Sequence, residues 1–119
     1  SKNSANAKGA SKADIAEVVG AVNNLEKQGR EMEELRQQFA NSGAGDCALL
    51  TKKHGQTVAE LQKKIKLLPR EYRNYLVPAL TEAEVCASCS TAALGACDNV
   101  RKSLDDMQKN VVEASENKQ

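Results

Sequence analysis

Apolar and small residues recur every three or four positions along most of this chain, and this spacing is the strongest constraint on its fold. The repeat is clearest toward the C-terminal end. Its members there are Cys86, Ser90, Ala93, Cys97, Val100, Leu104, Met107 and Val111. Side chains spaced in this way share one face of an α-helix. The pattern therefore predicts a helix over about 82–114.

The same stepping predicts a first helix over about 13–40, in which Arg36 falls out of the apolar register. Two glycines in the segment 41–45 then supply the left-handed backbone that commonly follows a helix C-terminus. Asp46 is expected to cap a second helix over about 47–67.

Two prolines, Pro69 and Pro78, bracket the segment that follows, and they predict a tight connector over 69–80 with a short helical turn. Thr81 and Glu84 match a capping box, which predicts the start of the last helix. No segment shows the alternation of a β-strand. The sequence thus predicts an all-α fold, an antiparallel up-down-up bundle of three long helices with a short connector helix.

Composition indicates one helical domain over 11–114, with a flexible N-terminal segment at 1–10 and a flexible C-terminal tail at 115–119. The chain has 17 basic and 16 acidic residues, a balance that argues against nucleic-acid binding. No apolar run is long enough for a membrane span. Aromatic residues make up 3% of the chain and no catalytic motif occurs, so we expect neither a cofactor nor an enzyme.

The four cysteines are Cys47, Cys86, Cys89 and Cys97. An even number in a short chain favours disulfides and an oxidising compartment, which means a secreted, periplasmic or organelle-lumen protein. Cys47 and Cys97 are equidistant from residue 72, which lies inside the predicted connector. Because such positions lie side by side in an antiparallel hairpin, we expect these two to be bonded.

The remaining pair, Cys86 and Cys89, has C-x-x-C spacing in the first turn of the predicted last helix. A structural disulfide or a buried thiol pair is the simpler interpretation. The alternative is a thiol-based redox site, because a helix N-terminus lowers a thiol pKa, or a zinc site completed by Cys97 and His54. Without a metal role, His54 is expected to be a partly buried residue at a helix interface.

Charge is uneven along the chain. The segment 52–73 has seven basic residues and two acidic ones, whereas 81–106 has five acidic and two basic residues. One interpretation is that neighbouring helices of opposite charge attract each other within the bundle. The other is that the basic segment docks on an acidic partner or an anionic surface.

Tyrosines and arginines gather in the connector region, and both residue types are favoured at protein interfaces. The predicted partner-binding residues are Lys66, Arg70, Tyr72, Arg73 and Tyr75. The competing interpretation is that they fill the end of the core. The predicted function is a non-enzymatic helical interaction module, such as a surface antigen domain or an accessory subunit of a larger assembly. Its partner is a protein of acidic character, and self-association is also possible for such a bundle.

Overall fold

The computed structural model describes residues 12–117, and all regular structure in that range is helical. The elements are α2 (Lys12–Glu31), α3 (Glu33–Ser42), α4 (Cys47–Ile65), α5 (Arg70–Cys86), α6 (Ala93–Met107), the π-helix η1 (Gln108–Glu113) and α7 (Ala114–Asn117). The predicted all-α class is confirmed. The segment predicted to be flexible at 1–10 lies outside the described residues, as do 118–119. Residues 115–117 of the predicted tail are helical instead.

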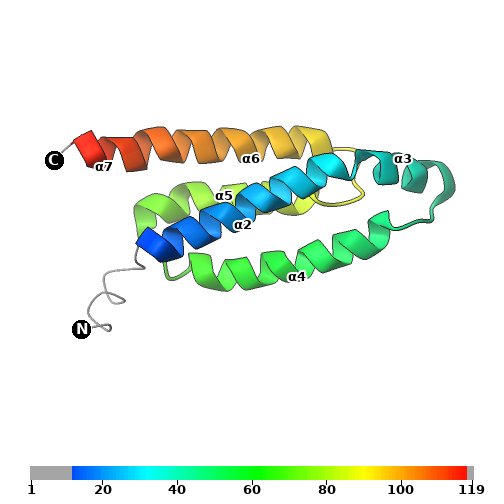
Figure 1. Cartoon of the computed structure of the whole chain (residues 1–119), viewed down its shortest axis with the longest axis horizontal. Coiled ribbons are helices and arrows are strands. Elements are labelled where there is room, and N and C mark those ends of the chain that lie inside the picture. Colours follow the sequence, from blue (N-terminus) through cyan, green and yellow to red (C-terminus); the bar gives the residue numbers. More distant parts are fainter. Residues whose placement is uncertain (1–11, 118–119) are drawn as a thin grey trace.

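The long helices alternate in direction along the chain (Figure 1). α2 crosses the face of α5, while α6 runs along one side of this pair and α4 along the other. α2 packs against α4, α5 and α6, and α5 packs against α4 and α6. The core lies between them. Its fully buried side chains include Val18, Val22, Leu25, Val58, Ile65, Leu76 and Val100.

α5 is the main departure from the sequence prediction, because it is a helix of 17 residues rather than a short connector. It continues through Pro78, which is exposed and deprives only the Asn74 carbonyl of its usual helical partner. Thr81 lies inside α5, where its hydroxyl donates to the Val77 carbonyl at 3.1 Å. The predicted capping box at this position is therefore wrong.

The last helix begins at Ala93, and residues 87–92 form the loop before it. Serine side chains hold this loop by local bonds. The Ser88 hydroxyl donates to the Val85 carbonyl at 2.7 Å and accepts from the Ser90 amide at 3.1 Å. Such short-range bonds compete with helix formation. Within the described residues the fold thus has α5 as a further long helix, in place of the predicted connector.

This change in topology also changes the disulfide. The structure joins Cys86 to Cys97, with an S–S distance of 2.01 Å and a Cα–Cα distance of 4.7 Å. The predicted bond between Cys47 and Cys97 is wrong because α5 lies between α4 and α6 in the chain, and Cys97 of α6 meets the end of α5 rather than the start of α4. The two bonded cysteines lie on either side of the loop 87–92, at the facing ends of α5 and α6.

The predicted first helix is interrupted at Met32, whose ψ of −1° separates α2 from α3. The predicted end of this first helical segment, at the glycines of 41–45, is confirmed. Gly43 has φ of +71°, and its amide donates to the Phe39 carbonyl at 2.7 Å. Asp46 occupies the predicted cap position of α4, but its side chain makes no capping hydrogen bond.

A close approach of α2 and α5 occurs at Gly29. A Cβ placed on this residue would lie 2.5 Å from Cys86 Sγ and 2.7 Å from the Cys86 carbonyl carbon. Only a residue without a side chain leaves room for the backbone of α5 at this point. The glycine therefore allows α2 to rest directly on the disulfide.

Candidate functional site

Arg36 ties three segments together beside the disulfide, and its side chain is buried. Its guanidinium donates to the carbonyls of Gly29 and Cys86, at 2.9 and 3.1 Å, and to that of Ser88 at 2.9 Å. It also pairs with the carboxylate of Glu33. Arg36 holds the C-terminal end of α5 and the start of the following loop against α2, which is a structural role.

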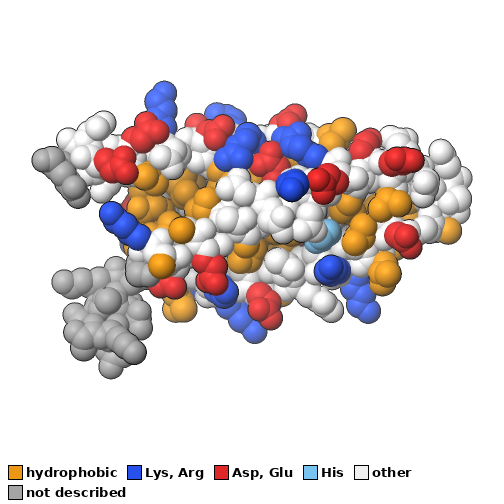
Figure 2. Space-filling model, viewed as in Figure 1, with side chains coloured by type: hydrophobic (Ala, Val, Ile, Leu, Met, Phe, Trp, Pro, Cys, Tyr) orange, Lys and Arg blue, Asp and Glu red, His pale blue; other side chains and the backbone are white. Residues whose placement is uncertain are grey.

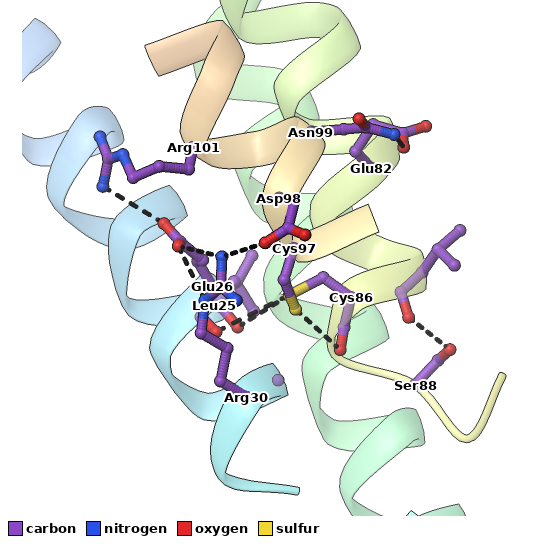
Figure 3. The surroundings of a disulfide bond; sticks show 12 residues. Leu25, Glu26, Arg30, Glu82, Cys86, Ser88, Cys97, Asp98, Asn99 and Arg101 are labelled. Carbon is purple, nitrogen blue, oxygen red and sulfur yellow. Dashed lines mark hydrogen bonds and ion pairs between the residues drawn. A yellow bond between two sulfur atoms is a disulfide. The ribbon is translucent and has the colours of Figure 1, made fainter. Parts of the chain in front are cut away.

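A second polar cluster lies between α2 and α6, close to the disulfide (Figure 3). Glu26 is nearly buried, and it pairs with Arg30 at 3.0 Å and with Arg101 of α6 at 3.2 Å. Arg30 also reaches Asp98 at 2.9 Å. In the space-filling view, acidic and basic side chains alternate along this seam (Figure 2). The ion pairs among these four side chains therefore join α2 to α6.

The structure does not pair Cys86 with Cys89, so the predicted structural disulfide or buried thiol pair at the C-x-x-C spacing is wrong. Cys86 is bonded to Cys97 and fully buried, while Cys89 is a free thiol in the loop. Across residues 12–117, no three His, Cys, Asp or Glu side chains lie close enough together to hold a metal ion. His54 is not near a metal-type cluster but is buried at the interface of α4 and α2, as its alternative interpretation predicted.

The residues predicted to bind a partner fall into two groups. Tyr72 and Tyr75 are partly buried and pack against the hydrophobic core. The Tyr75 hydroxyl also accepts a hydrogen bond from Asn110 Nδ2 at 3.2 Å. Lys66, Arg70 and Arg73 instead line two adjoining surface hollows. The structure therefore brings the three basic residues together and separates them from the tyrosines.

The deeper hollow is a groove of about 410 Å³ between the end of α4 and α5. We call it the basic groove. It is lined by Gln62, Ile65, Lys66, Arg73, Val77, Leu80 and Thr81. A shallower hollow shares its wall and is lined by Arg70, Arg73, Asn74, Val77 and Pro78. Neither lining contains a carboxylate, and Val77 is 53% exposed. The sequence prediction missed Val77, because it placed this residue in a connector rather than on a helix face.

The charge of the basic groove is not neutralised from within the bundle. Among residues 12–117, no ion pair joins the basic segment 52–73 to the acidic segment 81–106. Lys64 pairs with Glu17 of α2, and Arg101 and Lys102 are used within α6 and toward α2. Direct ion pairs between the two segments therefore do not occupy the charges of the groove.

Arg73 has the most unusual surroundings in the groove. Its Nε is buried, and it is the one buried side-chain nitrogen or oxygen in the described part of the chain that has no hydrogen-bond partner. A buried N–H donor without an acceptor costs on the order of 1–3 kcal/mol. The groove is thus lined by positive charge, and the Nε–H of the arginine in its lining is buried without an acceptor.

No helix in residues 12–117 is long and apolar enough to cross a membrane. Comparison of the chain with protein-family models, with curated proteins and with solved structures finds no match.

Proposed function

We propose that this protein is a non-enzymatic interaction module whose basic groove binds an acidic segment of a partner protein. The observation that carries this proposal is an open groove whose lining includes Lys66 and Arg73, with Arg70 in the adjoining hollow and no carboxylate in either lining. A carboxylate of the partner would pair with these positive charges.

The lining of the groove specifies what kind of segment would fit. Lys66 and Arg73 supply positive charge in the groove and Arg70 in the adjoining hollow, and no carboxylate opposes them. Ile65, Val77 and Leu80 supply apolar surface at its base and rim. The matching occupant is a segment that alternates acidic residues with aliphatic ones, so that both kinds of surface are covered at once.

Two of the predicted interface residues have a different role in this proposal. Tyr72 and Tyr75 support the groove from behind, because they pack against the core rather than line the hollow. Val77 takes their place as the exposed apolar anchor. We also propose that the protein works in an oxidising compartment, and the disulfide between Cys86 and Cys97 supports this.

The test is selection from a displayed library of random peptides against the whole protein, followed by affinity measurement on the selected peptides. Peptides rich in Asp or Glu and in Leu or Ile should be enriched. Lys66→Gln and Arg73→Gln should each weaken their binding by at least about 10-fold, as expected at an interface hot spot. Helicity, followed by circular dichroism, should be unchanged.

Lys52→Gln is the matched control. Lys52 is exposed near the opposite end of α4, and its loss changes the net charge by the same amount. The control should leave peptide affinity within about two-fold of the unaltered protein, since a distant exposed charge acts only through screened attraction. Equal weakening by all three variants would indicate non-specific charge attraction. Full affinity in Arg73→Gln would show that the groove is not the binding site.

A further inference from the structure

The two cysteines left free by the disulfide lie together, although they are far apart in sequence. Cys47 is the first residue of α4 and is fully buried, whereas Cys89 is partly exposed in the loop between α5 and α6. Thr51 connects them. Its Oγ1 donates to the Cys47 carbonyl at 2.9 Å and lies 3.2 Å from Cys89 Sγ. Thr51 therefore places the Cys89 thiol beside the first turn of α4, which begins at Cys47.

Both thiols are held in place by their surroundings. Cys47 is fixed by the first turn of α4, and the loop around Cys89 is fixed by the bonds of Ser88 and by Arg36, which donates to the Ser88 carbonyl. Holding two reactive groups near each other raises the effective concentration of one at the other by orders of magnitude. A reaction that joins them is therefore strongly favoured over separate reactions of each.

We propose that Cys47 and Cys89 are an oxidisable pair, which closes a second disulfide when the protein meets a small disulfide oxidant such as oxidised glutathione. The new bond ties the start of α4 to the loop between α5 and α6, beside the existing disulfide. This proposal is independent of the basic groove, which lies at the other end of α4.

The reaction balances as a thiol–disulfide exchange in two steps. The Cys89 thiolate attacks one sulfur of oxidised glutathione, whose S–S bond breaks to release one glutathione and leave a mixed disulfide on Cys89. The Cys47 thiolate then attacks Cys89 Sγ and releases the second glutathione. Two electrons pass from the protein to glutathione, and the two thiol protons end on the two released glutathione molecules.

Accessibility sets the order of these steps, since Cys89 is partly exposed and Cys47 is not. Burial, together with the hydrogen bond and charge of Cys89, raises the pKa of Cys47 to about 11. The positive charge of Arg36 and the hydroxyl of Thr51 lower this pKa. Glu33 also faces this region, through its pair with Arg36.

The first step changes the groups around the Cys47 thiol. Conversion of Cys89 into a mixed disulfide removes the thiol whose charge and hydrogen bond disfavour the Cys47 thiolate, while Arg36 and Thr51 remain. Attack by Cys47 is therefore promoted once the first step is complete. Without an oxidant to accept two electrons, the pair stays reduced.

The test is incubation of the whole protein with graded ratios of oxidised to reduced glutathione, followed by alkylation, trypsin digestion without reductant and mass spectrometry. The peptide 37–52, which contains Cys47, should be recovered linked to the peptide 74–101, and the protein should lose two hydrogens. Reduction should separate the two peptides. Cys89→Ala should abolish the link.

A matched control moves the second thiol by one position, in the double variant Ser88→Cys with Cys89→Ala. The Ser88 side chain is directed to the Val85 carbonyl rather than to Thr51. This variant should form the link at least about 10-fold more slowly, since proximity is lost. Separate glutathione adducts on Cys47 and Cys89 without a link would overturn the proposal. So would a link that forms equally fast in the control or persists in Cys89→Ala.

Discussion

Replacement of Gly29 by alanine tests the contact between α2 and α5 more sharply than any other single change in the bundle. The added methyl group would meet the Cys86 carbonyl and would lie 2.5 Å from Cys86 Sγ. Both partners are fixed, since one is backbone and the other belongs to a disulfide. No side-chain rotation can relieve the overlap, so α2 and α5 must move apart.

Overpacking and helix propensity act in opposite directions on the free energy of unfolding of Gly29→Ala. Overpacking of a closely packed core typically costs 1–3 kcal/mol, and a fixed backbone neighbour places this case at about 3 kcal/mol. Alanine stabilises a helix interior by about 1 kcal/mol relative to glycine. Gly29→Ala should therefore lower the free energy of unfolding by about 2 kcal/mol.

Gly20 provides the control within the same helix. A Cβ at Gly20 would meet nothing within 4 Å, so Gly20→Ala should gain helix propensity and raise the free energy of unfolding by up to about 1 kcal/mol. Urea denaturation followed by circular dichroism measures both variants under identical conditions. If Gly29→Ala is as stable as the unaltered protein, or is stabilised like Gly20→Ala, the close approach of α2 to α5 is wrong.

Three further predictions follow from buried polar and sulfur groups. Arg36→Met should lower the free energy of unfolding by about 3 kcal/mol, because it leaves buried carbonyls unpaired; a loss below about 1 kcal/mol in urea would contradict this role. Replacement of Cys86 and Cys97 together by alanine should cost about 3 kcal/mol, given their separation of 11 residues, and unchanged urea denaturation would refute that estimate. Burial lowers the pKa of His54, and the charge of Lys53 lowers it further. The unfolded chain therefore binds a proton below about pH 6.5 that the folded protein resists, so stability should be full above that pH and decline as the pH falls toward the folded pKa. His54→Gln should flatten this decline, and an identical pH profile would contradict it.

The helical periodicity was enough to predict the class of the fold and the position of α4. Residues of α4 that the stepping assigns to one face, such as Val58, Leu61 and Ile65, are buried. The glycine at 43 was also predictable, because a left-handed residue is a common helix terminator. Local rules of this kind depend on a few neighbouring residues, which the sequence shows directly.

The predicted topology is wrong because Pro78 does not end a helix. It lies on an exposed side of α5, where the loss of one hydrogen bond is tolerated. The real break lies at 87–92, where serine hydroxyls satisfy backbone groups locally. Small polar residues within an apolar repeat were the available signal for this loop.

Buried charge could not be predicted from periodicity. Glu26 is a charged residue outside the apolar repeat and Arg36 interrupts that repeat, yet both side chains are buried. Each is accepted in the interior because partners distant in sequence satisfy it, namely Arg101 for Glu26 and the carbonyls of Cys86 and Ser88 for Arg36. Such partners are known only once the helices are arranged in space.

The measurement that tests the proposed function most directly is the NMR signal of the Arg73 Nε–H group. In the free protein this donor is buried without an acceptor. Titration with an acidic, aliphatic peptide chosen by the selection should shift this signal, because the peptide would pair with the same guanidinium, while the Nε–H signal of Arg30, already paired with Glu26, should stay in place. Peptide binding that leaves the Arg73 signal unchanged would contradict recognition through the basic groove.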